Sequence, residues 1–134
     1  EELSVFACVE KSLPNQLYFM IAYPAAFLAS IYRTIKDEKY LKGAQQYMDF
    51  ALGCHEDVYA SFFSHKIMWA ASVLYHITQE EKYLTVIERI GRHYIKAQDS
   101  TSGLWSMEDD NTKWDQSSEI LCWMFTVIKN LSKY

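Results

Sequence analysis

The sequence predicts an all-α protein made of antiparallel helical hairpins, and three observations support this fold class. A motif recurs at an offset of 43 positions, apolar residues flank it at helical spacing, and turn-forming residues are scarce. Four Gly and two Pro among 134 residues are too few for a chain of many short strands. Half of the residues are hydrophobic, so we expect a single domain over residues 1–134 with a sizeable core.

The repeat is clearest in two segments of 14 residues. Residues 28–41 read LASIYRTIKDEKYL, and residues 71–84 read ASVLYHITQEEKYL. Both segments have Tyr at the fifth place and end in Glu-Lys-Tyr-Leu. Because only a few residues separate the apolar pattern before the motif from the pattern after it, each copy is predicted to be two helices packed antiparallel.

The first hairpin is predicted from its apolar spacing and its capping residues. We expect Pro24 in the first turn of its first helix, where the missing N–H costs nothing, and Asp37 at the N-cap of its second. A short helix over Leu3–Lys11 is expected to precede it, closed by Pro14. The apolar positions before and after the motif are Phe27, Leu28, Ile31, Ile35, Tyr40, Ala44, Tyr47 and Ala51.

The second hairpin follows the same pattern, and a third is incomplete. Thr78 and Glu81 spell a capping box, S/T-x-x-E, before the second helix. A further helix is predicted over Glu119–Leu131, which gives about six helices in all. The apolar positions are Ile67, Ala70, Ala71, Leu74, Tyr83, Ile87, Ile90 and Tyr94 in the second hairpin, and Ile120, Met124, Phe125, Ile128 and Leu131 in the last helix.

Residues 16–134 resemble the helical-hairpin repeat of α/α-toroid proteins, which include six-hairpin glycosidases, sugar epimerases and prenyl cyclases. The series Gly91-x-x-Tyr94-x-x-x-Gln98-x-x-x-x-Gly103-x-Trp105 is similar to the QW motif of squalene-type cyclases, with one residue more than usual between Gln and Gly. Asp99-Ser-Thr-Ser-Gly-Leu-Trp also resembles the D-x-x-x-G-L-W turn of unsaturated-glucuronyl hydrolases. A full toroid needs about six hairpins, so the resemblance implies a partial toroid completed by a second copy or by the rest of a larger chain.

In a toroid, the starts of the inner helices line the central cavity, and the resemblance places several chemical groups there. Asp115 and Glu119, four positions apart on one helix face, are candidate acid and base, because neighbouring carboxylates can hold different pKa values. His65 is a candidate base. Aromatic rings stack on sugars and also stabilise carbocations. The candidate substrate-binding residues are Tyr23, Trp69, Trp105, Trp114 and Trp123.

Each of these assignments has a structural alternative. Asp115 is then a helix N-cap and Glu119 a solvated first-turn acid favoured by the helix dipole. His65 is then a structural histidine, and the aromatic residues belong to the core. The acidic triplet Glu108-Asp109-Asp110 either binds a cation or protonates a substrate, or it is a charged surface loop; the DxDD acid of protonating cyclases is absent.

The favoured function is therefore a carbohydrate-active toroid enzyme, related to glycoside hydrolases, lyases or epimerases, that acts on a sugar or another small molecule. The alternatives are a terpenoid or polyene cyclase and a non-catalytic helical-repeat binding module. No cofactor and no metal are expected, since Cys54-His55 lacks further ligands at zinc-site spacing. A homodimer would complete the ring.

Composition bounds the partners and the compartment. The net charge of -4 and the scattered Lys and Arg argue against a nucleic-acid partner. No apolar run reaches the ~18 residues that a membrane span needs. Three widely spaced Cys favour a reducing, cytoplasmic setting over a disulfide framework, although a removed signal peptide would leave no trace. The start at Glu1, without Met, indicates a processed chain or a fragment.

Overall fold

A computed structural model describes residues 8–105 and 110–132, and within them the fold is all-α, as the sequence predicts. An isolated bridge between Gln98 and Trp105 is the one β-type pairing in this part of the chain. The elements are α1 (Phe19–Ile35), α2 (Glu38–Leu52), the short 3-10 helix η2 (Glu56–Tyr59), α3 (Ser64–Thr78), α4 (Glu81–Ala97) and α5 (Asp110–Leu131).

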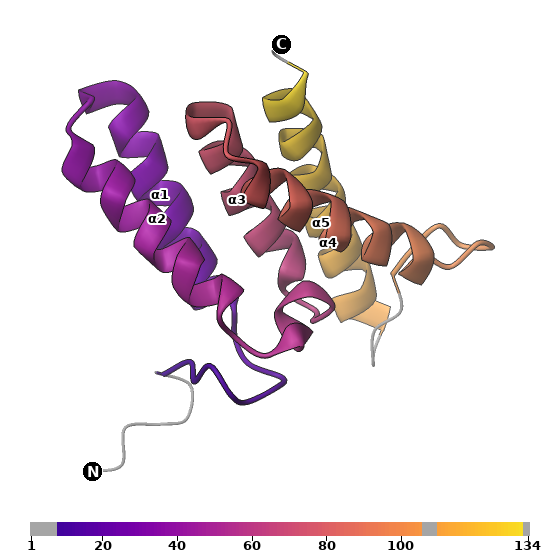
Figure 1. Ribbon diagram of the computed structural model, residues 1–134. Helices are drawn as coiled ribbons and strands as arrows, with labels where there is room; N and C mark the ends of the chain where they lie inside the picture. Colours follow the sequence, from indigo (N-terminus) through magenta and orange to yellow (C-terminus); the bar gives the residue numbers. More distant parts are fainter. Residues whose placement is uncertain (1–7, 106–109, 133–134) are drawn as a thin grey trace.

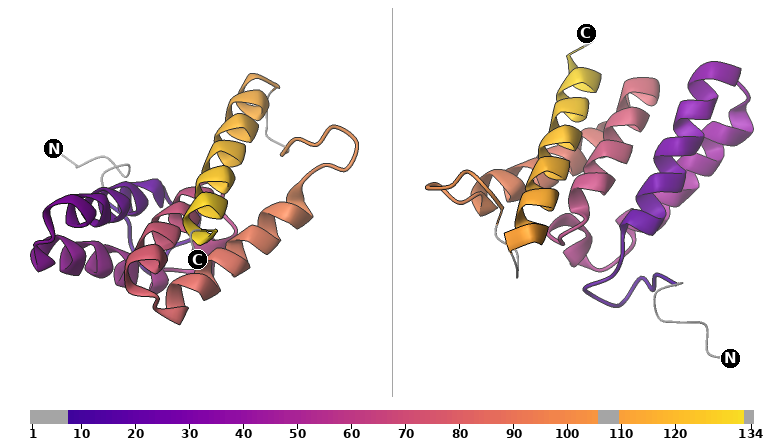
Figure 2. Two further views of the ribbon diagram at one scale, coloured as in Figure 1. Left: turned by 90° about the horizontal axis from the view of Figure 1, so that it is seen from above. Right: turned by 180° about the vertical axis from the view of Figure 1, so that it is seen from behind.

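The helices form two layers. Helices α1, α3 and α5 stand in a row and run in the same direction, with their N-terminal ends at the lower end of Figure 1. Helix α2 packs against α1 and helix α4 against α3, in front of that row in Figure 1 and behind it in the right view of Figure 2. The starts of α1, α3 and α5 therefore lie at one end of the molecule.

Helix α3 is the centre of the fold, because it contacts α1, α2, α4 and α5. A helix enclosed in this way must be apolar nearly all round, and the α3 sequence has only a few polar side chains to bury. The buried residues of α3 are Ser64, His65, Lys66, Ile67, Met68, Ala70, Ala71, Ser72, Val73 and Leu74. Burying a histidine and a lysine requires partners for them, and these partners define the candidate site below.

The two repeated turns have the same backbone geometry. Lys36 and Gln79, which end α1 and α3, are both left-handed, with φ of 63° and 59°. Their N–H groups donate to the carbonyls of Tyr32 and Tyr75, the tyrosines that the sequence repeat aligns. The repeat found in the sequence therefore marks two equivalent helix–turn–helix junctions.

The two N-terminal capping predictions had different outcomes. Asp37 caps α2 as predicted, since its Oδ1 accepts the Lys39 N–H at 3.1 Å. The capping box is wrong: Thr78 is the last residue of α3, and its hydroxyl donates to the Leu74 carbonyl at 2.9 Å. The N-cap of α4 is Glu80, which makes no side-chain capping bond.

Pro24 is not in a first turn, because α1 begins at Phe19 and Pro24 is its sixth residue. The helix starts earlier than the apolar spacing suggested because Ile21 and Ala22 are buried in the core, and packing outweighs the local preference for ending a helix near proline. The carbonyl of Met20 consequently has no N–H four residues later to accept.

The chain before α1 differs from prediction. Part of the predicted Leu3–Lys11 helix lies outside the described residues, and residues 8–11 are not helical. The side chain of Gln16 holds this segment in a turn, accepting the Glu10 N–H at 2.6 Å and donating to the Leu13 carbonyl at 2.6 Å. These local side-chain bonds compete with the helical ladder.

Helix α5 is also longer than predicted. It begins at Asp110 rather than Glu119, because no Gly or Pro interrupts residues 110–131. Its buried residues Ile120 and Val127 join the same hydrophobic cluster as those of the other four helices. None of the described helices is long and apolar enough to cross a membrane.

Candidate functional site

The buried lysine and histidine of α3 meet a carboxylate from α5. Lys66 Nζ lies 3.1 Å from Glu119 Oε1, and His65 Nε2 lies 3.7 Å from Glu119 Oε2. The Lys66 side chain is 8% exposed and that of Glu119 is 27% exposed, so the carboxylate is the part of this pair that solvent reaches. We call Glu119, Lys66, His65, Tyr94 and Trp123 the Glu119 cluster.

Glu119 is held in its ionised form. Its partial burial raises the pKa, but hydrogen bonds from Trp123 and Lys66, together with the Lys66 charge, lower the pKa of Glu119 below its usual value overall. Trp123 Nε1 donates to Glu119 Oε1 at 3.3 Å from one turn further along α5. At neutral pH Glu119 can therefore accept a proton or a hydroxyl hydrogen bond, but it has no proton to give.

His65 is completely buried, and burial lowers its pKa to about 4. Its imidazole is therefore neutral at neutral pH. Nδ1 lies 3.1 Å from the Phe62 carbonyl oxygen, which favours a proton on Nδ1. Nε2 has no hydrogen-bond partner among the described residues and faces the Glu119 carboxylate. A ligand in the solvent does not reach this ring, so His65 lies behind the carboxylate that faces solvent.

Tyr94 of α4 is hydrogen-bonded to His65 on the side away from Glu119. Its hydroxyl accepts the backbone N–H of His65 at 3.1 Å and lies 3.2 Å from the carbonyl oxygens of Ser61 and Phe62. Burial raises the pKa of Tyr94, so the phenol keeps its proton. Trp105 packs next to it, donating its indole N–H to the Tyr94 carbonyl at 2.8 Å. Trp105 is thus a buried ring rather than an open platform.

Three aromatic rings surround the Lys66 ammonium. Nζ lies 4.9 Å from the ring centroid of Phe63, 5.2 Å from that of Phe19 and 5.5 Å from that of Tyr23. Each distance is within the range of a cation–π contact. Together with Glu119, these rings compensate for the desolvation of a lysine that is almost fully buried.

Two tryptophans lie beside the Glu119 carboxylate. The rings of Trp69 and Trp123 are 4.1 Å apart at 31°, and the Tyr23 ring meets Trp69 edge-on at 6.1 Å. Tyr23 comes from α1, Trp69 from α3 and Trp123 from α5, so all three helices of the row contribute to the candidate site.

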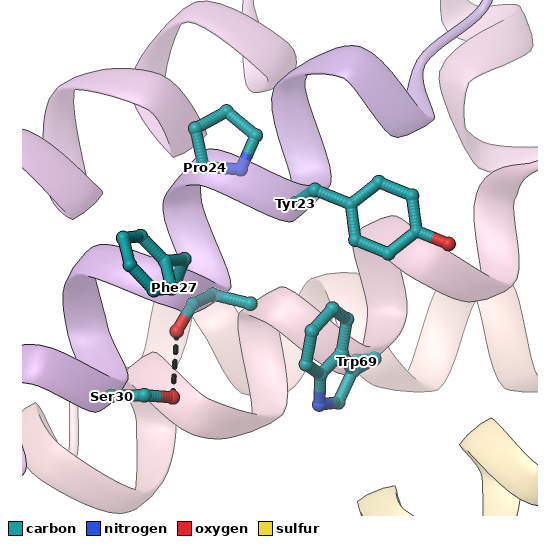
Figure 3. A pocket seen from close by; sticks show the side chains of 6 residues that line it. Tyr23, Pro24, Phe27, Ser30 and Trp69 are labelled. Atoms are coloured by element: carbon teal, nitrogen blue, oxygen red, sulfur yellow. Dashed lines mark hydrogen bonds between the residues drawn. The ribbon is translucent and has the colours of Figure 1, made fainter.

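An open groove of about 540 Å³ continues from these rings along α1. Figure 3 shows the Trp69 ring of α3 lying below the Tyr23 ring of α1, with Phe27 one turn further along α1. The lining residues are Tyr23, Pro24, Ala26, Phe27, Ser30 and Trp69. Tyr23 and Trp69 therefore border both the groove and the Glu119 cluster.

The structure gathers Tyr23, His65, Trp69, Glu119 and Trp123 and places the other predicted site residues elsewhere. Asp115 is exposed and accepts a hydrogen bond from Gln116 Nε2 at 3.1 Å. Trp114 is 65% exposed on α5. Glu108 and Asp109 lie outside the described residues, as does the side chain of Asp110.

The N-cap alternative for Asp115 is wrong. Asp115 is the sixth residue of α5 and Glu119 the tenth, so neither stands at the helix start. Glu119 is ion-paired and mostly buried rather than a solvated first-turn acid. Of the two predicted carboxylates, Glu119 alone is both ion-paired and partly buried, whereas Asp115 is exposed.

Sequence reasoning missed Lys66 and Tyr94. A lysine directly before the apolar residues 67–71 is a signal that could have been used, because a charge on a buried helix face needs a partner. Tyr94 fits the helical pattern as an apolar position, and that pattern gives no information about the hydrogen bonds of its hydroxyl.

The described residues contain no group of three or more His, Cys, Asp or Glu arranged to hold a metal ion. Cys8, Cys54 and Cys122 are free thiols. Searches against protein-family models, curated proteins and solved structures gave no match. The chemistry of the Glu119 cluster and its groove is therefore the basis of the functional argument.

Proposed function

We propose that this chain is a carbohydrate-active enzyme, or part of one, built on a partial α/α toroid, with Glu119 as its reactive carboxylate. The observation that carries the proposal is the ionised, partly exposed Glu119, which is hydrogen-bonded to Trp123, whose ring packs against that of Trp69. Sugars present an apolar C–H face to aromatic rings and hydroxyl groups to carboxylates, and this edge of the molecule offers both.

Glu119 would act as the general base. Glu119 is ionised at neutral pH, which is the protonation state that a general base needs to take a proton from water or from a sugar carbon or hydroxyl. Lys66 and Trp123 would hold its orientation, while Trp69 and Tyr23 position the ring of the sugar. Cleavage of a glycoside also needs an acid for the leaving group. The predicted candidate is Asp115, which lies one turn earlier on α5, exposed and outside the Glu119 cluster.

The arrangement of helices supports the toroid part of the proposal. Helices α1, α3 and α5 run parallel with their starts at one end, and α2 and α4 cover them on the other side (Figures 1 and 2). Further hairpins, from a second copy or from a longer chain, would extend this row into a ring. The terpenoid cyclase alternative has Glu108-Asp109-Asp110 as its predicted proton donor, and these side chains lie outside the described residues. Glu119, which is ionised, does not supply that proton.

The test is a ligand titration followed by a turnover assay. The intrinsic fluorescence of Trp69 and Trp123 reports binding of a panel of glycosides that includes unsaturated uronides, and chromatography reports products. We expect saturable binding by the unaltered chain and a loss of at least about 100-fold in turnover for Glu119→Gln. Asp115→Asn should lower turnover as well if Asp115 is the acid.

Two controls keep the result interpretable. Glu88→Gln removes an exposed carboxylate on α4 that pairs with Arg92 at 3.5 Å, and it should leave binding and turnover unchanged. Glu119→Gln leaves the Lys66 charge buried without its anion and should lower stability by about 2 kcal/mol, so circular dichroism must confirm that the variant is folded. No glycoside bound, or Glu119→Gln behaving like the unaltered chain, would overturn the proposal.

A further inference from the structure

The groove between α1 and α3 differs in chemistry from the site that it joins. The Glu119 cluster presents a carboxylate and an indole N–H, whereas the groove is lined by rings and aliphatic carbon. Phe27 is 64% exposed there and Tyr23 40% exposed, which are high values for large apolar side chains. A molecule that spans both would have to be polar at one end and apolar at the other.

Beyond Tyr23 and Trp69, which border the Glu119 cluster, the groove has one polar side chain in its lining, and this side chain is engaged. The Ser30 hydroxyl donates to the Ala26 carbonyl at 2.8 Å, as drawn in Figure 3. Pro24 has no N–H, so the α1 backbone offers no donor at that point. A second sugar ring needs several hydrogen-bond partners, and this lining does not supply them.

We infer that the substrate is a glycoside with an apolar aglycone, whose sugar lies at Glu119 and whose aglycone lies in the groove between α1 and α3. Tyr23 and Trp69 border both parts, so one ligand passes from the carboxylate to the groove without leaving aromatic contact. A volume of about 540 Å³ is in the range of small-molecule sites and accommodates an aromatic or short aliphatic group. This inference rests on the proposed function and names its substrate class.

The test compares matched ligands that share one sugar. Methyl and phenyl β-glycosides of glucose, galactose and glucuronic acid are titrated against the chain, with benzyl alcohol as the apolar group alone. The phenyl glycoside of the sugar that binds should bind roughly tenfold more tightly than its methyl glycoside, the gain expected from burying about 60 Å² of apolar surface. Benzyl alcohol alone should bind far more weakly than the phenyl glycoside.

One pair of variants tests whether the tighter binding of the phenyl glycoside comes from contacts in the groove. Phe27→Ala should reduce the phenyl-over-methyl ratio to about threefold or less, and the binding of the methyl glycoside should stay unchanged. Phe125→Ala is the matched control, because Phe125 is a 77% exposed phenylalanine on α5 that does not line the groove. Both rings are largely exposed, so both variants are expected to fold.

The outcomes separate this inference from the proposed function. If methyl glycosides bind and Glu119→Gln weakens them, but phenyl gives no gain or Phe27→Ala does not reduce it, the proposed function stands and the aglycone inference is wrong. If no glycoside binds, or benzyl alcohol binds as tightly as the phenyl glycoside, both are wrong.

Discussion

The two hairpins have the same turn but different chemistry. The junctions at Lys36 and Gln79 have the same left-handed geometry, and α2 and α4 begin 43 positions apart, at Glu38 and Glu81. At the end of each hairpin far from its turn, where α1 and α3 begin and α2 and α4 end, the residues of the two copies differ. At the offset of 43, His65 stands where the first hairpin has Ala22.

The substitutions in the second hairpin are matched across its two helices. Ala22 of α1 and Ala51 of α2 are fully buried, and their counterparts His65 of α3 and Tyr94 of α4 are hydrogen-bonded to each other. The backbone frame thus accepts either small apolar residues or a satisfied polar pair. The positions that the two copies share therefore account for the common backbone, and positions where the copies differ, such as His65 and Tyr94, belong to the candidate site.

We expect the greatest loss of stability when Tyr94 of the second hairpin is removed. Tyr94→Ala should lower the free energy of unfolding by about 4 kcal/mol, because it leaves a cavity and removes the acceptor of the His65 N–H. Urea unfolding followed by circular dichroism measures this. Tyr47→Ala, at a 43% exposed position of α2, is the control and should cost less than about 1 kcal/mol.

A loss at Tyr94 no greater than the loss at Tyr47 would contradict the supporting role of Tyr94. Tyr94→Phe separates the ring from the hydroxyl. It keeps the packing and removes the hydrogen bonds, so it should cost about 1–2 kcal/mol.

The second prediction concerns pH and His65. Burial lowers the pKa of His65 to about 4 in the folded state, against an ordinary value of about 6.5. Between these values the unfolded chain binds a proton that the folded chain does not. The neutral His65 therefore contributes its full amount to the free energy of unfolding above pH 6.5. As the pH falls from 6.5 toward 4, the free energy of unfolding decreases by about 2–3 kcal/mol.

The measurement is the free energy of unfolding between pH 7 and pH 4 for the unaltered chain and for His65→Ala, which restores the residue of the first hairpin. The difference between the two profiles removes the contributions of the other three histidines, which both chains contain. The titratable groups that face His65 are Glu119, Lys66 and Tyr94. Parallel profiles would show that His65 is protonated in the folded state and would contradict its burial as a neutral ring.

Part of this site could be predicted from sequence because it follows the repeat. The resemblance to a toroid singled out residues of the first, third and fifth helices, and the structure brings Tyr23, His65, Trp69, Glu119 and Trp123 close together, although Glu119 and Trp123 lie in the middle of α5. Asp37 was found because a cap is a local feature, written within three residues.

The rest depends on contacts between distant residues. Lys66 is balanced by Glu119, 53 positions later, and no local pattern shows that pair. The start of α1 differs from prediction because burial of Ile21 extends the helix ahead of Pro24. The start of α5 differs because no Gly or Pro ends the helix between Asp110 and Glu119. Tertiary packing decides such boundaries more than local propensity does.

The smallest expected effect tests the equivalence of the two turns. A non-glycine residue in the left-handed region costs about 1 kcal/mol, so Lys36→Gly should raise stability by roughly 0.5–1 kcal/mol. Gln79→Gly should gain less, because the Gln79 side chain donates to the Tyr75 carbonyl at 2.9 Å and glycine loses that bond. Thermal unfolding of both variants, with Lys36→Ala and Gln79→Ala as controls that gain nothing, measures the difference. A gain from alanine equal to that from glycine would show that backbone strain is not what the two turns share.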